Sequence, residues 1–148
     1  MIIEGYVEQG KHLGRSLGFP TANVRPERVA GDWPENGVYA AAFWIDGDDR
    51  AWPGMLNQGV HPTETQGNPT VEVHLIGFDG EVFGGAVRVE YLRFLRPERR
   101  FDGLDALKAQ LMRDREDVLA WLSEARACVF PDTAQRRVRE IEWREDLF

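Results

Sequence analysis

The sequence predicts a mainly β fold, a small antiparallel barrel covered by one amphipathic helix. Up to residue 95 the chain consists of short apolar or alternating runs separated by glycine, proline and Asp-Gly turns, which is typical of an all-β domain. From Phe101 onwards the apolar residues recur at helical spacing instead. The chain has 148 residues, of which 43% are hydrophobic, so it can bury the core of one domain without a metal or a disulfide.

Three strands are expected in the first part of the chain. Residues 2–9 form the first, with Gly5 as the expected position of a bulge or of close backbone approach. Residues 24–36 contain two prolines and a glycine and show no clear period, so we expect a long connection that covers the site. Residues 37–45 form the second strand, and an Asp-Gly pair then predicts a hairpin turn into a third strand over residues 50–56.

The middle of the chain predicts a loop followed by a second hairpin. Residues 57–69 carry two prolines and two glycines and are expected to form a loop beside the site. In residues 70–78, three apolar side chains alternate with a glutamate, a histidine and an isoleucine, which is the pattern of a strand. A further Asp-Gly pair connects this strand to one over residues 81–95, and we expect the two to pair with each other.

A long helix is expected to close the domain. It begins at an Asp102 N-cap, and Asp105 in its first turn favours the helix dipole. The apolar stripe that we expect to pack on the barrel comprises Leu104, Leu107, Leu111, Val118, Trp121 and Leu122.

Residues 126–148 are expected to form an extension of unknown role beyond a domain of residues 1–125. Within it, residues 132–142 are compatible with a short helix in which Arg136 and Glu140 pair one turn apart. A docked helix and a loosely held tail both remain open.

Charge and composition limit the partners of the protein. The formal net charge of −7 argues against nucleic acid, because binding DNA or RNA needs a positive field. No apolar run is long enough to span a bilayer and no signal peptide is apparent, so no membrane partner is expected. The single cysteine, Cys128, cannot form an internal disulfide, which fits a cytoplasmic location. The oligomeric state stays open, and a monomer is compatible with the sequence.

The glycine-rich stretch of residues 10–23, G-K-H-L-G-R-S-L-G-F-P-T-A-N, is the strongest local indication of function. Its glycines allow the backbone to approach an anion closely, and Arg15 within it can meet phosphate oxygens through two parallel bonds. Thr21 and Asn23 leave the same face of an extended segment and offer neutral oxygen ligands that Mg²⁺ accepts beside phosphates. A plain turn is the alternative, whereas a P-loop is rejected because the glycines and proline forbid the helix that must follow.

This stretch resembles the riboflavin kinase (flavokinase) family, whose most specific mark is the P-T-A-N run at residues 20–23. Further matches follow in the family's order and cover about the first 125 residues: G-x-V-x-x-G at 5–10, G-V-Y at 37–39, N-x-G at 57–59, P-T at 62–63, V-E-V-H-L at 71–75, F-G at 83–84 and L-R-P-E-x-x-F at 95–101. The resemblance implies a closed Greek-key barrel of about six antiparallel strands. It also implies Mg²⁺-dependent transfer of the γ-phosphoryl group of ATP to riboflavin, which gives FMN and ADP.

The resemblance assigns roles to particular residues. Metal contacts fall to Thr21 and Asn23, and flavin contacts to Arg96, Arg99 and Phe101, which suits a flat ring with carbonyl groups. Nucleotide contacts fall to Gly10, Arg15, Thr21, Asn23, Leu75, Gly77 and Phe83.

Glu72 is the expected catalytic base, because the family has its catalytic glutamate in a strand of this pattern. Its carboxylate would accept the proton of the ribityl 5′-hydroxyl. Without the surrounding motif, a glutamate between valines would indicate only the solvated face of a strand. His74 has no cysteine or histidine partner at ligand spacing, so we expect a hydrogen-bonded or exposed histidine and not a zinc ligand.

Three departures from the family pattern accompany the match. Leu13 and Glu64 stand where an arginine and an aromatic residue are common, which bears on ligand affinity. The FMN adenylyltransferase module of most bacterial members is not expected here, and neither is conversion of FMN to FAD. Two other hypotheses stay open: a catalytically silent flavin- or nucleotide-binding regulator, and a partner-binding module that uses the C-terminal extension.

Overall fold

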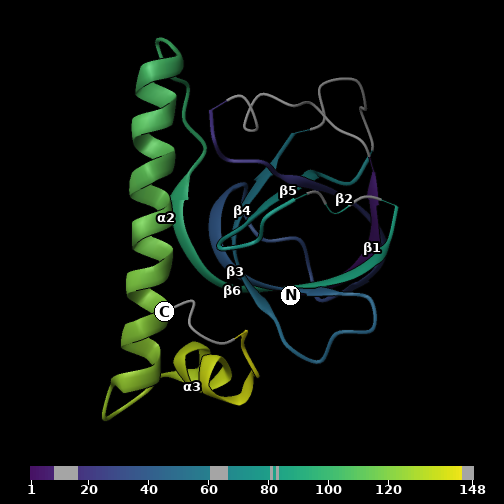
Figure 1. The fold of residues 1–148 in the computed structure, drawn as a ribbon, viewed down its shortest axis with the longest axis vertical. Coiled ribbons are helices and arrows are strands. Elements are labelled where there is room, and N and C mark those ends of the chain that lie inside the picture. The colour runs from purple at the N-terminus through teal and green to yellow at the C-terminus, as the bar shows by residue number, and fades with distance from the viewer. Residues whose placement is uncertain (9–16, 61–66, 81, 83, 145–148) are drawn as a thin grey trace.

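The computed structural model describes residues 1–8, 17–60, 67–80, 82 and 84–144, which form a closed six-stranded barrel with two helices (Figure 1). The strands are β1 (Ile2–Glu8), β2 (Ala22–Ala30), β3 (Gly37–Ile45), β4 (Trp52–Gly59), β5 (Thr70–Leu75) and β6 (Ala86–Pro97), and the helices are α2 (Leu104–Ala127) and α3 (Thr133–Glu140). The strands neighbour one another in the order β1-β2-β5-β4-β3-β6, and every pair is antiparallel. The predicted mainly β barrel with a C-terminal covering helix is confirmed.

β2 corrects the expectation that residues 24–36 form a long connection, because the strand continues to Ala30. Pro26 lacks an N–H donor, but within the described residues the part of β2 beyond Val24 pairs with β1 alone. The register shifts between Glu4 and Gly5, which puts Pro26 opposite Gly5 at the predicted bulge. A proline is therefore tolerated in this strand.

The sequence predicts that the strands over residues 70–78 and 81–95 pair as a hairpin, and this prediction is wrong. β5 pairs with β2 and β4, whereas β6 pairs with β1 and β3 and so closes the barrel. The turn after β5 lies at Ile76 and Gly77 and not at the predicted Asp-Gly pair, where Gly80 has a φ of 111° at a bend of the chain. The chain then crosses to β1, where the Gly84 N–H donates to the Val7 carbonyl at 2.9 Å.

The alternation of the strands divides the apolar residues between two cores. In β5, Val71, Val73 and Leu75 point into the barrel and belong to the inner core. Ile76 faces the other way and belongs to a second core, which lies between the barrel and the helices. The face of β5 opposite the valines is therefore covered over part of its length.

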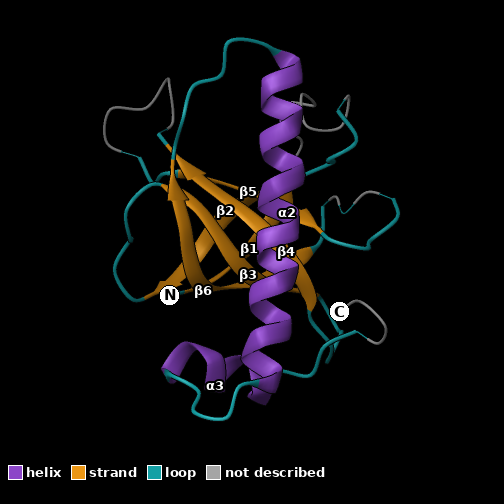
Figure 2. Ribbon diagram, turned by 90° about the vertical axis from the view of Figure 1, so that its left-hand side faces the viewer, coloured by secondary structure: helices purple, strands orange, loops and turns teal. Residues whose placement is uncertain are grey.

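α2 lies along one side of the barrel, over β3, β4 and β6 (Figures 1 and 2). Val118, Trp121 and Leu122 in its C-terminal half are buried in the second core. The fully buried alanines Ala40 and Ala42 of β3 let the helix approach the strand closely. The predicted packing of the helix on the barrel is thus confirmed for this half.

The N-terminal half of α2 differs from the predicted stripe. Leu104 is exposed, and the polar residues Gln110 and Asp114 are buried instead. The N-cap is Gly103 and not Asp102, and no side chain caps the helix there, although Asp105 lies in the first turn as expected.

α3 docks below the barrel and packs on α2 and β6 (Figure 1). Asp132 caps it in a capping box with Gln135, and Val138 is completely buried. Glu140 pairs with Arg137 at 3.3 Å and not with Arg136 as expected. Within the described part of the chain, neither helix has the length and apolar character of a membrane span.

Candidate active site

Five outward-facing residues form one continuous row across the barrel. Asn23 of β2 pairs directly with Glu72 of β5, which pairs directly with Asn57 of β4. The row continues through Val38 of β3 to Arg96 of β6. Directly paired residues project from the same face, with Cβ atoms about 4.5–5.5 Å apart. The row therefore brings together Asn23, Glu72 and Arg96, which the sequence analysis assigned to three different parts of the site.

A cleft of about 370 Å³ lies between this row and the N-terminal half of α2. Five of the predicted site residues line it, namely Thr21, Glu72, Arg96, Arg99 and Phe101. Its apolar walls come from the barrel, the helix and the connection between them: Val38, Met55, Leu107, Leu111 and Phe101. Glu72 and Thr21 lie towards one end of the cleft, and the two guanidinium groups lie with the carboxylate of Asp114 towards the other. Glu98 also lines the cavity.

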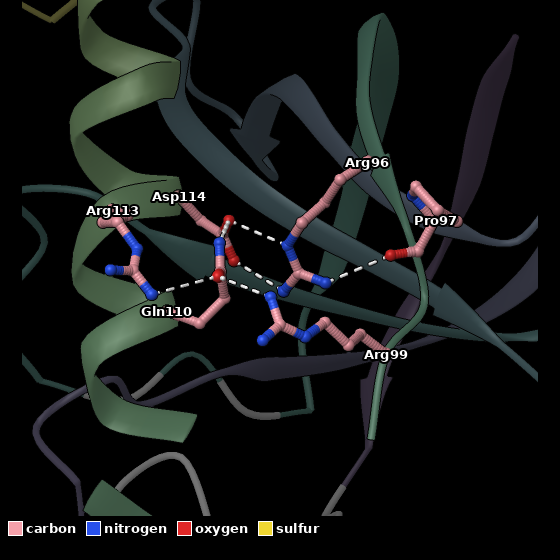
Figure 3. A network of polar contacts seen from close by, with 6 residues as sticks. All are labelled: Arg96, Pro97, Arg99, Gln110, Arg113 and Asp114. Atoms are coloured by element: carbon pink, nitrogen blue, oxygen red, sulfur yellow. Dashed lines mark hydrogen bonds and ion pairs between the residues drawn. The ribbon is translucent and has the colours of Figure 1, made fainter. Parts of the chain in front are cut away.

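A buried polar network joins β6 to α2 at the second end of the cleft (Figure 3). Arg96 donates from Nε to Oδ1 of Asp114 at 2.9 Å and from Nη2 to Oδ2 at 2.7 Å, which is a bidentate ion pair. Gln110 Nε2 donates to Oδ1 of the same carboxylate at 2.8 Å. Arg96 Nη1 also donates to the Pro97 carbonyl at 3.1 Å, so the guanidinium is fixed on several sides.

Phe101 lies against both arginines of the predicted flavin site. The guanidinium carbon is 5.8 Å from the ring centre for Arg96 and 5.2 Å for Arg99, within cation–π range. Arg99 Nη1 also reaches Gln110 Oε1 at 3.5 Å. The three residues therefore form one group of flat, cationic and aromatic surfaces in the cleft.

Gly37 allows the backbone of β3 to approach Arg96 closely. A Cβ at this position would lie 2.4 Å from the Arg96 carbonyl oxygen and 2.6 Å from the Phe94 ring. Its φ of 154° also favours glycine. The first residue of the G-V-Y motif is therefore a glycine where β3 packs closely on the backbone of Arg96.

His74 holds the segment that leads into Thr21. Its Nδ1 donates to the Pro20 carbonyl at 2.8 Å, and its ring makes an edge contact with Phe19 at 5.3 Å between centroids. Burial lowers the pKa of His74, the hydrogen bond to Pro20 opposes this, and Arg115 lowers it further. The expected hydrogen-bonded histidine is confirmed, and its lowered pKa favours the neutral form.

Three predicted nucleotide contacts, Asn23, Leu75 and Gly77, are not among the residues that line the cleft. Asn23 is the direct neighbour of Glu72 in the row. The Leu75 side chain points into the barrel core, so only its backbone faces a ligand outside. Gly77 is exposed in the turn after β5, with a φ of 86°.

Three other predicted contacts, Gly10, Arg15 and Phe83, lie outside the described residues, as do Leu13 and Glu64. Residues on either side of these undescribed segments are described. Val7, near the end of β1, bonds through its backbone to both Gly84 and Gly85. The end of β1, which precedes the glycine-rich stretch, is therefore adjacent to the end of the F-G motif.

The donor set at Thr21 and Asn23 fits Mg²⁺ only together with an anionic ligand. Both side chains offer neutral oxygens, whereas Mg²⁺ in proteins is commonly bound by few protein groups and by substrate phosphates. Among the described residues, no group of three His, Cys, Asp or Glu side chains is placed to hold a metal by itself.

Sequence reasoning missed Asn57, Gln110 and Asp114 as site residues. Asn57 opens the N-x-G motif, but the resemblance gave it no role. Asp114 lies on the helical stripe that runs from Leu107 to Val118, at a position where an apolar residue is expected. A carboxylate on that stripe was the available signal.

Comparisons with known proteins agree on one family. The family model described as Flavokinase, riboflavin kinase, matches residues 1–122. The bifunctional riboflavin kinase/FMN adenylyltransferase of Bacillus subtilis is 35% identical over 127 residues, which cover 84% of this chain and 39% of that protein. The protein of the same description from Pseudomonas fluorescens is 42% identical over 113 residues, or 76% of this chain and 35% of its own length. The chain spans less than two fifths of these curated relatives.

Two solved structures share the fold. A crystal structure described as a macrolide-efflux protein from Streptococcus pneumoniae matches with a TM-score of 0.71 and 29% identity, over 81% of this chain and 38% of that one. The riboflavin kinase of Trypanosoma brucei matches with a TM-score of 0.57 and 22% identity, over 83% of this chain and 80% of that one. At this identity the second match shows the fold alone.

Proposed function

This chain belongs to the riboflavin kinase family, and on that premise we propose that it transfers the γ-phosphoryl group of ATP to the 5′-hydroxyl of riboflavin. The products are FMN and ADP. The observation that carries the proposal is the cleft that Glu72 shares with Arg96, Arg99 and Phe101. A general base and a surface suited to a flat, carbonyl-bearing ring lie in one cavity, which is what phosphorylation of this alcohol needs.

The spacing of the row supports one orientation of riboflavin. Three strand spacings of about 4.8 Å separate Glu72 from Arg96, roughly 14 Å along the barrel surface. An extended ribityl chain attached to a tricyclic ring can bridge such a distance. The ring then lies at the Arg96 end, the ribityl chain crosses Asn57, and the 5′-hydroxyl meets Glu72.

The ring end of the cleft has the chemistry for a flavin. Leu107 and Leu111 on the helix face Val38 and Met55 on the barrel, which favours an apolar ring system between them. Phe101 and the two guanidinium groups beside it offer flat faces and N–H donors for the ring carbonyls.

At the other end, Glu72 acts as the general base. Its carboxylate accepts the proton of the 5′-hydroxyl as the bond from that oxygen to the γ-phosphorus forms. The bond from the γ-phosphorus to the bridging oxygen breaks, and ADP leaves with the electron pair. Asn23 pairs directly with Glu72 and is therefore a neighbour of the proposed base.

Thr21 and Asn23 would hold Mg²⁺ together with the nucleotide phosphates. The bound metal neutralises charge that develops on the phosphates during transfer. Gly10, Arg15, Gly77, Phe83 and the backbone of Leu75 complete the proposed ATP site. The proposal is supported by the backbone hydrogen bonds of Val7, which precedes the glycine-rich stretch, to Gly84 and Gly85 at the end of the F-G motif.

We further propose a cytoplasmic protein that works on riboflavin and ATP without a nucleic-acid partner. ATP is available in the cytoplasm, and a net charge of −7 disfavours binding to DNA or RNA. The oligomeric state stays open, and a monomer is compatible with the proposal.

Incubation of the purified protein with riboflavin, ATP and Mg²⁺ tests the proposal, with FMN followed by chromatography. We expect FMN to form in the complete mixture and not after addition of EDTA. Riboflavin binding, measured by quenching of flavin fluorescence, without any FMN would overturn the kinase and favour the silent regulator. FMN formation in the presence of EDTA would show that the reaction does not need a metal, and the kinase proposal would then stand without Mg²⁺.

A further inference from the structure

β6 is joined to the two helices by two ion pairs of the same geometry. Arg96 of β6 pairs with Asp114 of α2, and Glu90 of β6 pairs with Arg137 of α3. Both pairs are bidentate, with N···O distances of 2.7–2.9 Å. Asp114 is 2% exposed and Glu90 is 7% exposed. Arg96 and Asp114 line the cleft, whereas Glu90 and Arg137 do not. The second pair can therefore serve as a control for the first.

Stability alone is a weak reason for a buried ion pair in the cleft. Desolvation of the two charges offsets much of their attraction, and a well-packed apolar pair of similar size is commonly as stable. Asp114 also occupies the apolar stripe of α2, where the next buried residue of the helix is Val118. The carboxylate is therefore better explained by what it does to Arg96.

The contacts of Arg96 fix its guanidinium and leave part of it available. Arg96 donates one N–H from Nε and one from Nη2 to Asp114, and one from Nη1 to the Pro97 carbonyl (Figure 3). Of the five N–H donors of an arginine, two are then left without a partner among the described residues. The Arg96 side chain is 19% exposed, and its group lies over the Phe101 ring.

Gln110 holds the carboxylate in turn. Its Nε2 donates to Asp114 Oδ1, and its Oε1 accepts from Arg99 and, at 3.4 Å, from Arg113 (Figure 3). Gln110 is 9% exposed. Side chains of one face of α2 thus orient both arginines of the ring end of the cleft.

We propose that Asp114 is a positioning residue for the flavin, which holds Arg96 so that its remaining N–H donors face the ring. This role rests on the proposed function of the cleft. An arginine loses rotamer entropy when it is fixed in one conformation. Because Asp114 orders Arg96 before the ligand arrives, that cost is absent from binding.

Asp114→Asn tests the role, with Glu90→Gln as the matched control. Each substitution removes the charge of one buried carboxylate that is paired with an arginine, so both should lower the melting temperature. Only Asp114→Asn should raise the KM for riboflavin, by about tenfold, with kcat and the KM for ATP changed less than about twofold. The Kd for riboflavin from fluorescence quenching should rise by the same factor.

Several outcomes would overturn the role. Equal effects of the two substitutions on riboflavin binding would reduce Asp114 to a structural residue. Tighter riboflavin binding in Asp114→Asn would mean that the carboxylate only neutralises Arg96. Should Asp114→Asn not fold, Asp114→Glu keeps the charge and displaces it by one methylene. The same riboflavin-specific weakening is then expected, and a wild-type Kd would count against the proposal.

The binding measurement separates this inference from the proposed function. If the wild-type protein makes no FMN but binds riboflavin, the kinase proposal fails, and the Kd values of the two variants still test Asp114. If it makes FMN and both variants bind riboflavin as the wild type does, the kinase stands and the positioning role fails.

Discussion

Glu72 of β5 and Asn23 of β2 are directly paired residues of the barrel, and both side chains leave its outer face. Their Cβ atoms are about 5 Å apart in such a pair. The proposed base and a proposed metal ligand are therefore neighbours across one strand boundary, although they lie far apart in the sequence. Asn57 of β4 pairs with Glu72 from the opposite side.

We expect Glu72→Gln to lose about two to four orders of magnitude in kcat, because the amide cannot accept the proton of the 5′-hydroxyl. The Kd for riboflavin should stay within about twofold, since the side chain keeps its size. FMN formation and fluorescence quenching measure the two quantities. Glu4→Gln is the control, because Glu4 is another outward-facing strand glutamate and lies outside the cleft. A Glu72→Gln variant with near-normal turnover would contradict the role of Glu72.

The two asparagines beside Glu72 should respond differently to substitution. Asn23→Ala should raise the Mg²⁺ concentration needed for half-maximal rate by about 10- to 100-fold, because bonds to charged groups contribute about 1.5–3 kcal/mol. Asn57→Ala should instead raise the KM for riboflavin by about 3- to 10-fold, the effect of one neutral hydrogen bond. Initial rates at varied Mg²⁺ and riboflavin distinguish the two effects. The same profile for both variants would refute the proposed division of the row.

The sequence was sufficient for the architecture but not for the strand pairing. Alternation predicts that Val71 and Val73 face a core, and the structure agrees. It does not predict that β6 pairs with β1 and β3, because pairing between distant strands depends on closure of the barrel and not on the adjacent turn. The strand through Pro26 was missed for a similar reason, since its tolerance depends on the bulge opposite Gly5.

The candidate site, like the fold, could be predicted only in part from the sequence. Glu72, Thr21 and Arg96 lie in motifs, so the sequence could single them out. Asp114 acts through a contact between a helix and a strand, and no local pattern specifies that its carboxylate meets Arg96. A polar residue on an apolar stripe indicates that a partner exists, but only the packing identifies it.

Gly5→Ala should destabilise the protein by about 3 kcal/mol, at the upper end of the usual cost of overpacking. A Cβ at this position would lie 2.0 Å from the Arg25 carbonyl oxygen, which is backbone and can move only with β2. The melting temperature should fall by roughly 10 °C. Gly85→Ala is the control, because a Cβ there meets nothing within 4 Å, and its melting temperature should hardly change. Equal melting temperatures of the two variants would be incompatible with the close approach at the bulge.

The stability of the protein should decrease as the pH falls below about 6.5, and His74 should account for part of the decrease. Burial and Arg115 lower the pKa of His74 in the folded state, whereas the unfolded chain keeps the ordinary value of 6.5. Below that value the unfolded state binds more protons than the native state, so protons favour unfolding. The loss is absent above about pH 7.5 and grows until the pH reaches the lowered folded pKa.

His74→Asn removes this titration and keeps an N–H donor for the Pro20 carbonyl. We therefore compare the fall in melting temperature from about pH 7.5 to about pH 5.5 in the variant and the wild type, so that the other histidines cancel. A smaller fall is expected in His74→Asn, because its unfolded state no longer gains a proton at this position. An equal fall would show that His74 is not held neutral by its surroundings.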